Sequence, residues 1–81
     1  MTKFSENLVA IREAKGLTQE KMVLWLAERG LRITRTRLKS WELGERMPGA
    51  YVLIRLCDVL DIVDIRSFVN HHIVTLSDNQ S

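Results

Sequence analysis

The stretch from Thr34 to Gly44 constrains the fold more than any other, because it combines two kinds of residue at helical spacing. Thr34 is a hydroxyl residue of the kind that caps the N-terminus of a helix. Leu38 and Trp41 follow three residues apart, as they do on one face of a helix. The other positions are basic or carry short polar groups, namely Arg35, Thr36, Arg37, Lys39 and Ser40. The stretch therefore predicts a short helix with one apolar side and one basic side.

Apolar residues at spacings of three and four predict four further helices around this one. The first is expected from Ser5, its cap, to Gly16, and the second from Gln19 to Arg29 with Thr18 as its cap. The other two are expected from Pro48 to Leu60, and from Ile65 to His72 with Asp64 as its cap. The residues expected to face the core are Phe4, Leu8, Ile11, Met22, Val23, Leu26, Val52, Leu53, Leu56, Cys57, Val59, Leu60, Ile62, Phe68 and Val69. The predicted fold is all-α, a compact five-helix domain over residues 1–72. A tail follows over residues 73–81, in which the β-branched segment 73–76 is expected to be extended or a short strand.

Composition places the chain among small single domains. Its 81 residues are 46% hydrophobic, which is enough for one core. Cys57 is the only cysteine, so neither an internal disulfide nor a thiol cluster for zinc can form. The N-terminus MTKFSENL is polar, and no apolar run approaches the roughly 20 residues of a membrane span. We therefore expect a cytoplasmic protein without a signal peptide or a membrane partner.

The charge of the chain is distributed unevenly. The net charge is only +2 and the sequence pI is about 9.0. Between Arg29 and Lys39, however, five residues are basic and none is acidic. Such a local basic stripe is typical of a surface that binds a polyanion. A solvated charged face would have the same composition, so composition leaves both interpretations open.

The residue types that act in catalysis or bind metals do not occur at the spacings of a catalytic or metal site. His71 and His72 are adjacent and lack the spacing and the further ligands of a metal centre. The aspartates Asp58, Asp61 and Asp64 are three residues apart, and we expect one of them to cap a helix and all of them to face water. No nucleophile with a base, paired catalytic carboxylates or phosphate-cradling glycine loop is found. The sequence predicts a protein that is not an enzyme and has no cofactor or metal.

Two short helices joined by a tight turn, the second of them basic on its outer side, already form a helix-turn-helix pattern. The segments IREAKGLTQEKM, ITRTRLKSWELGERMP and LIRLCDVLDI, in this order, resemble the Cro and lambda-type repressor family, also called the Xre family. The resemblance covers roughly Leu8 to Ile62. It implies a lambda-repressor-like fold whose third helix, about residues 34–43, reads DNA.

The resemblance also implies a structural ion pair between the first and third helices. In the family, an arginine of helix 1 commonly pairs with a glutamate at the end of the recognition helix, and Arg12 and Glu42 occupy these positions. Glu42 follows the core residue Trp41, and a carboxylate that is partly buried there needs a cation. The alternative is that Arg12 and Glu42 are two unrelated surface charges.

The operator contacts of the family carry over to particular positions of this chain. The resemblance implies base contacts by Arg35, Thr36 and Ser40, and phosphate contacts by Gln19, Arg37, Lys39 and Arg46. Arg35 has the geometry for a bidentate pair with guanine, and Gln19 begins a helix whose N–H groups suit a phosphate. For Arg37 and Lys39, simple solvation is the alternative.

The chain departs from the family pattern at several positions of its second helix. Val23 stands where a small residue is usual, and the segment from Ala27 to Ile33 has one extra residue. Both features predict an angle between the two helices that differs from the usual one in the family. Leu24 and Trp25 occupy positions that are usually polar, so an apolar surface there needs cover from the tail or from a partner. For Trp25, we expect cover from within the chain.

Two functions are consistent with these features. The first is a sequence-specific transcriptional regulator, most readily a repressor that binds a palindromic operator as a homodimer. Its dimer interface is expected beyond the shared fold, at Phe68, Val69, Ile73, Val74 and Leu76. The second is a protein-interaction module or antitoxin-type protein with the same fold, which holds a protein partner through Leu24, Trp25 and the tail.

Overall fold

The computed structural model describes residues 3–69, which form five α-helices. The helices are α1 (Lys3–Ala14), α2 (Gln19–Glu28), α3 (Arg35–Leu43), α4 (Ala50–Val59) and α5 (Ile65–Val69). Over these residues there is no strand, so the predicted all-α fold is confirmed. The expected strand at 73–76, the end of the fifth helix near His72 and the proposed tail 73–81 lie outside the described residues.

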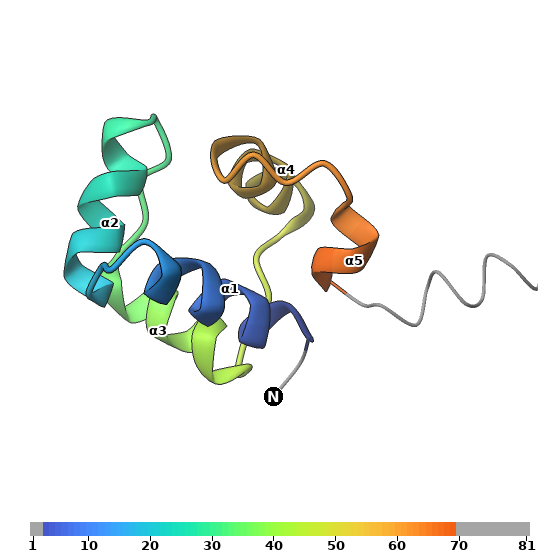
Figure 1. The fold of residues 1–81 in the computed structure, drawn as a ribbon, viewed down its shortest axis with the longest axis horizontal. Coiled ribbons are helices and arrows are strands. Elements are labelled where there is room, and N and C mark those ends of the chain that lie inside the picture. The colour runs from blue at the N-terminus through green and yellow to red at the C-terminus, as the bar shows by residue number, and fades with distance from the viewer. Residues whose placement is uncertain (1–2, 70–81) are drawn as a thin grey trace, which may run out of the picture.

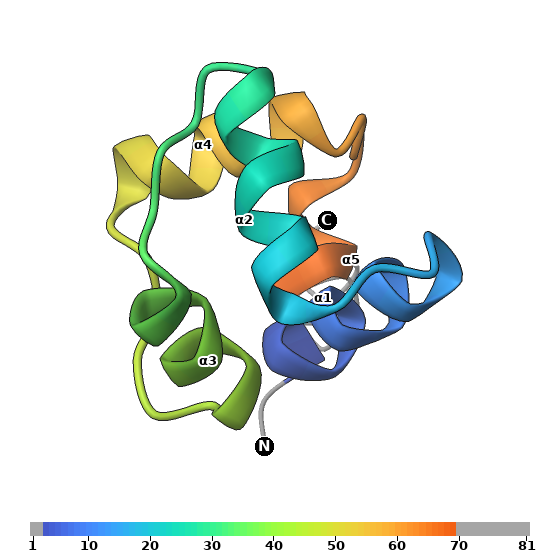
Figure 2. The same ribbon diagram turned by 90° about the vertical axis from the view of Figure 1, so that its left-hand side faces the viewer.

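The helices pack around one core to which all five contribute. α1 packs against both α3 and α5, and α2 packs against α3. Figures 1 and 2 show α4 on the side of the molecule away from α3, joined to it by the loop that follows α3. The buried residues of the core are Phe4, Leu8, Met22, Leu26, Leu31, Leu38, Trp41, Leu56, Cys57 and Phe68. All of them come from the five helices except Leu31, which anchors the connection between α2 and α3.

The prediction that Ser5 caps the first helix is wrong. α1 already includes Lys3 and Phe4, and Ser5 is buried within its first turn. The reason is packing, because Phe4 and Leu8 are both fully buried and lie one turn apart on the same face. Phe4 takes this place in the core only if it is itself helical.

The predicted N-caps Thr18 and Asp64 are confirmed, whereas α4 begins at Ala50 with Gly49 as its N-cap rather than at Pro48. The backbone N of Lys21 donates to Thr18 Oγ1, and that of Ser67 donates to Asp64 Oδ1. α4 ends differently from the rest, since Asp61 adopts a φ of 61° there. Aspartate is one of the few residues that tolerate this left-handed conformation, which lets Ile62 N donate to Cys57 O at 2.8 Å.

α5 is held against α1 by an apolar contact and a polar one. The rings of Phe4 and Phe68 meet edge to face at 5.1 Å between centroids. Asn7 Nδ2 donates to the Phe68 carbonyl at 3.0 Å. Phe68 is only 4% exposed, so its ring is used within the chain rather than offered to a partner, contrary to its expected place in a dimer interface. Val69 is half-buried against the same core, and the other interface candidates, Ile73, Val74 and Leu76, lie outside the described residues.

Candidate nucleic-acid interface

α3 is capped at both ends by the residues that the sequence indicates. Thr34 Oγ1 accepts a hydrogen bond from Arg37 N at 3.1 Å, and Thr34 itself is extended, as an N-cap should be. Gly44 ends the helix with a φ of 77°, a conformation that glycine adopts without steric cost. These two caps fix where a nine-residue helix begins and ends, and thereby the rotation of every side chain on it.

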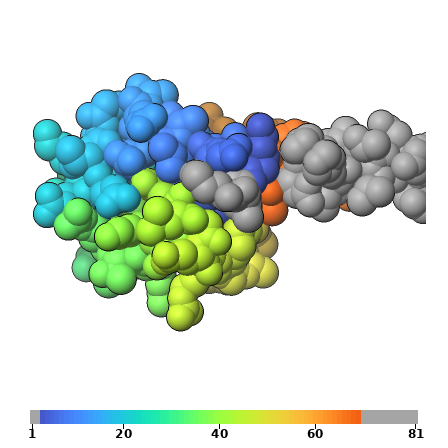
Figure 3. Space-filling model, turned by 90° about the horizontal axis from the view of Figure 1, so that it is seen from below, coloured from blue at the N-terminus to red at the C-terminus, as the bar shows by residue number. Residues whose placement is uncertain are grey.

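The two sides of α3 differ sharply in burial. Leu38, Trp41 and Glu42 are buried, with at most 5% of any of them exposed. On the other side Arg35, Thr36, Arg37 and Lys39 are exposed and Ser40 is half-buried. Figure 3 shows α3 and the start of the following loop at the surface of the lower face of the molecule, next to α1. The predicted division into a core side and a basic side is therefore present.

A hydrogen-bonded cluster on the inner side ties α3 to α1 and α2. Arg12 Nε lies 2.7 Å from Glu42 Oε2, and Arg12 Nη2 donates to Glu42 Oε1 at 3.1 Å. The ion pair expected from the resemblance is thus present and is bidentate. Arg12 Nη1 also donates to the Leu17 carbonyl at 2.8 Å. The hydrogen bond to Glu42 raises the pKa of Arg12, against the opposing effect of burial.

Gln19 completes this cluster through a hydrogen bond that the sequence did not predict. Its Nε2 donates to Glu42 Oε1 at 2.9 Å, so one acceptor oxygen serves both Arg12 and Gln19. Gln19 is half-buried at the first position of α2. One hydrogen of its carboxamide is therefore used inside the protein. A phosphate at this helix end would meet the backbone N–H groups and the remaining amide hydrogen.

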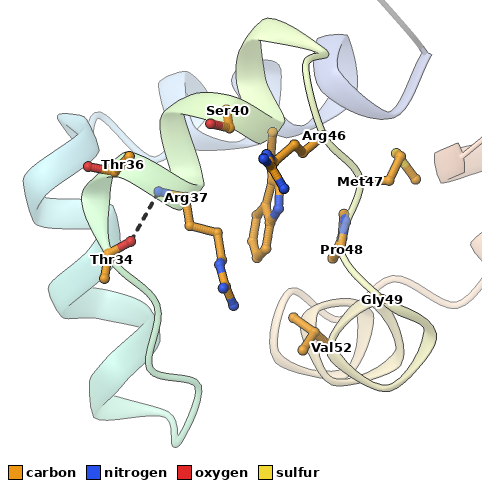
Figure 4. A pocket seen from close by; sticks show the side chains of 10 residues that line it. Thr34, Thr36, Arg37, Ser40, Arg46, Met47, Pro48, Gly49 and Val52 are labelled. Atoms are coloured by element: carbon orange, nitrogen blue, oxygen red, sulfur yellow. Dashed lines mark hydrogen bonds between the residues drawn. The ribbon is translucent and has the colours of Figure 1, made fainter.

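A hollow of about 490 Å³ lies beside α3, between this helix and the loop that leads to α4. Figure 4 shows Arg37 and Arg46 extending towards it from its two sides. The residues that line it are Thr34, Thr36, Arg37, Ser40, Trp41, Arg46, Met47, Pro48, Gly49 and Val52. The structure thus brings together four predicted contact residues, Thr36, Arg37, Ser40 and Arg46. Arg35 and Lys39 lie on the exposed surface of α3 outside this hollow.

Among residues 3–69, no acidic side chain pairs with the cations of this surface. Ion pairs join Arg12 to Glu42 and Arg29 to Glu28. Within that range, Arg35, Arg37, Lys39 and Arg46 enter neither an ion pair nor a side-chain hydrogen bond. Four unneutralised cations on and beside one helix create a positive potential that attracts a polyanion.

Arg29, counted in the basic stripe from the sequence, has a different role. Its guanidinium stacks on the Trp25 ring at 3.8 Å, and its Nη1 donates to the Trp25 carbonyl at 3.0 Å. Lys15 Nζ lies over the same ring at 4.4 Å. The expectation that Trp25 is covered from within the chain is confirmed by these two cations. Leu24 remains 64% exposed.

The described residues contain no other recognisable site. No group of three or more His, Cys, Asp or Glu side chains is placed to hold a metal ion in residues 3–69. His71 and His72 lie outside that part of the chain. Over the same residues, no helix is both long and apolar enough to cross a membrane.

Comparison with known sequences agrees with this geometry. Residues 8–68 match the sequence model of a family described as "Helix-turn-helix". The chain belongs to this helix-turn-helix family. The match spans α2, α3 and their connection, and it confirms the assignment to the Cro/Xre type that the sequence motifs indicated.

A similar protein is known from Bacillus subtilis (strain 168). It is called "Uncharacterized HTH-type transcriptional regulator YqaE" and is 42% identical to this chain over 59 residues. The matched part is 73% of this helix-turn-helix chain and 47% of the relative, so the chain spans about half the length of that relative. No solved structure gave a significant match.

Proposed function

We propose that this helix-turn-helix protein is a sequence-specific DNA-binding transcriptional regulator that reads DNA with α3. The observation that carries the proposal is the outer side of α3, where cations without acidic partners stand on a helix whose inner side is locked to the core. The membership in the helix-turn-helix family and the name of the Bacillus relative support it. The proposed DNA-binding domain is residues 1–72, with 73–81 as a separate tail.

Within this proposal, the residues of α3 divide into two groups. Arg35, Thr36 and Ser40 contact base edges, because they lie on the first two turns of the helix and point away from the core. Arg37 and Lys39 contact phosphates on either side of the groove. Arg46 reaches a phosphate from the loop, and the hollow that it shares with Arg37 gives the DNA backbone room to enter.

In the proposal Gln19 still contacts a phosphate, but its side chain contributes less to this contact than its backbone. Its side chain is held by Glu42, so the contact relies chiefly on backbone N–H groups of the first turn of α2. The bond to Glu42 also holds this helix end next to α3. The phosphate site and the recognition helix are then positioned by one carboxylate.

The regulator is proposed to act as a repressor and as a homodimer on a palindromic operator. A single recognition helix contacts only a few base pairs, and a two-fold dimer doubles the sequence that is read. Half-sites one helical turn apart let both copies of α3 enter the major groove from the same side of the duplex.

A protein-interaction module, for example an antitoxin, is the second candidate. Its support is Leu24, a large apolar side chain that stays exposed on α2. Trp25 no longer supports it, because Lys15 and Arg29 cover its ring. If binding a protein were the only function, the exposed cations of α3 would have no role. We therefore place this candidate second.

A salt titration on selected and random duplexes tests the proposal. A pool of random duplexes, selected for binding, should return one sequence with two-fold symmetry. The three phosphate-contacting cations of each subunit would release counterions from six phosphates per dimer. The slope of log K against log salt should then be about −5, at about 0.9 per phosphate. Absence of duplex binding at about 50 mM salt would refute DNA binding.

A further inference from the structure

α4 presents an outer face that stays exposed in the described part of the chain, residues 3–69. Tyr51 is 71% exposed and Ile54 is 57% exposed, and Asp58 is exposed one turn further on. These residues are three and four positions apart, so they line one side of the helix. We call Tyr51, Ile54 and Asp58 the α4 face. An exposed aromatic residue next to an exposed branched aliphatic one is typical of an interface rather than of open surface.

The α4 face is separate from the proposed DNA surface. Val52, on the same helix, lines the hollow beside α3. Two residues turn an α-helix by about 200°, so Val52 and Ile54 lie on nearly opposite sides of α4. A partner on the α4 face therefore leaves the hollow and α3 open to DNA.

Tyr51 is held in place by the protein and still has a hydrogen to donate. Arg55 Nη1 donates to the Tyr51 hydroxyl oxygen at 3.3 Å. Arg55 Nη2 donates to the Gly30 carbonyl, also at 3.3 Å, which anchors the guanidinium to the turn after α2. Because the hydroxyl oxygen accepts from Arg55, its own hydrogen remains for an outside acceptor. A carboxylate is the strongest such acceptor among side chains.

The α4 face carries that acceptor itself. Tyr51 lies three residues before Ile54 and Asp58 four residues after it, so the two polar groups are about 4.5 and 6 Å from Ile54 along the axis. In an antiparallel pair of α4 helices with Ile54 near the two-fold axis, each Tyr51 lies opposite Asp58 of the partner subunit. Two equivalent hydrogen bonds then form, each from a Tyr51 hydroxyl to the Asp58 carboxylate of the partner subunit, and they flank the apolar contact between the two Ile54 side chains.

We propose that the α4 face is the surface through which two copies of this chain pair, antiparallel about Ile54. This rests on the proposed homodimeric regulator and names its interface. One helix face per subunit is small compared with the roughly 1,200 Å² of the smaller stable interfaces. The pair is therefore weak in free solution and forms mainly when two subunits occupy neighbouring half-sites, as cooperative DNA binding.

Disulfide trapping tests the pairing in the full chain. In Ile54→Cys the two thiols lie near the two-fold axis, and mild oxidation should yield a covalent dimer at high protein concentration and, more completely, on the selected duplex. Leu24→Cys is the matched control, since Leu24 is 64% exposed but lies on α2. It should stay monomeric. Cys57 is 2% exposed, and burial raises the pKa of its thiol, so it does not compete.

A charge exchange gives a second test that does not depend on cysteine. Asp58→Lys should weaken cooperative DNA binding about tenfold, because the ammonium meets Tyr51 and Arg55 of the partner subunit. The double variant Tyr51→Glu with Asp58→Lys should recover cooperativity, because opposite charges again face each other. Both positions are exposed, so thermal unfolding should not change.

The possible outcomes separate this inference from the proposed function. Cooperative binding to a palindrome without trapping at position 54 would overturn the α4 pairing and leave the DNA-binding function intact. Equal trapping at positions 54 and 24 would also overturn it, because random collision would then explain both. Absence of duplex binding by the unaltered protein would instead refute the function itself.

Discussion

The two sides of α3 use their charges in opposite ways. On the inner side, Glu42 is 5% exposed and accepts hydrogen bonds from Arg12 and Gln19. On the outer side, Arg35 and Arg37 are exposed and have no acidic partner within residues 3–69. The inner charges hold the helix to the rest of the protein, and the outer charges are left for a ligand. A substitution should therefore change folding on one side and binding on the other.

The largest effect is expected on the inner side. Glu42→Ala removes the only carboxylate of the cluster and leaves Arg12 without its ion pair. Breaking a buried pair costs several kcal/mol, and we expect a loss of about 3 kcal/mol in the free energy of unfolding because Arg12 still reaches solvent. Urea unfolding followed by circular dichroism measures this loss.

Glu28→Ala is the control for that experiment. Glu28 also pairs with an arginine, Arg29, but at 3.7 Å and with 75% of its side chain exposed. Such pairs contribute about 0–1 kcal/mol, so this variant should unfold almost like the parent protein. Equal losses in the two variants would mean that burial does not set the strength of the inner pair.

The next largest effects are expected on the outer side, in binding rather than in stability. Arg35→Ala should relax the preference at one base pair by about 1–3 kcal/mol, because a bidentate contact to a base is lost. Arg37→Ala should weaken all sequences alike and reduce the steepness of the salt slope by about 2, because each subunit of the dimer loses one phosphate contact. Competition binding with single-base operator variants distinguishes the two. A uniform loss for Arg35→Ala would remove its role as a base reader.

These two sides also differ in how far the sequence predicts them. The helix types and the caps Thr18, Thr34 and Asp64 follow from signals within a few residues, and the structure confirms them. The division of α3 into a core side and a basic side follows from helical periodicity. Local sequence is sufficient where the interaction itself is local.

Contacts between distant residues were predicted only where the family pattern supplied them. The pair of Arg12 with Glu42, 30 residues apart, was found in this way. The bond from Gln19 to the same carboxylate and the stacking of Arg29 on Trp25 were not. Nothing in the spacing of an arginine tells whether it faces a polyanion or lies on a nearby ring, because both positions are on a helix surface. The edge-to-face contact of Phe68 with Phe4 was not predicted for a related reason, since Phe4 comes from the other end of the chain.

Asp64 combines features of both sides of α3, because it is exposed like the outer charges and hydrogen-bonded like the inner ones. Its contribution to stability should be the smallest of the effects predicted here. Hydrogen bonds from Ser67 Oγ at 2.9 Å and Ser67 N at 3.2 Å lower its pKa below the ordinary value. The unfolded chain then binds the proton more tightly than the folded one. The contribution of Asp64 to stability is therefore present above the unfolded pKa of about 3.9 and is lost as the pH falls through the lower, folded value.

Asp64→Asn isolates this contribution, because an amide oxygen still caps α5 but does not titrate. The difference in melting temperature between the parent protein and this variant should shrink as the pH is lowered from about 6 to about 2. Ser67→Ala removes the hydroxyl donor and should lose most of the same pH dependence, because that hydrogen bond is the main cause of the lowered pKa. If the parent and Ser67→Ala melt with the same pH dependence, the hydroxyl does not stabilise the carboxylate. A clear pH dependence in the parent alone would show that an exposed charge contributes to the fold once it has a fixed partner, as Glu42 does more strongly inside.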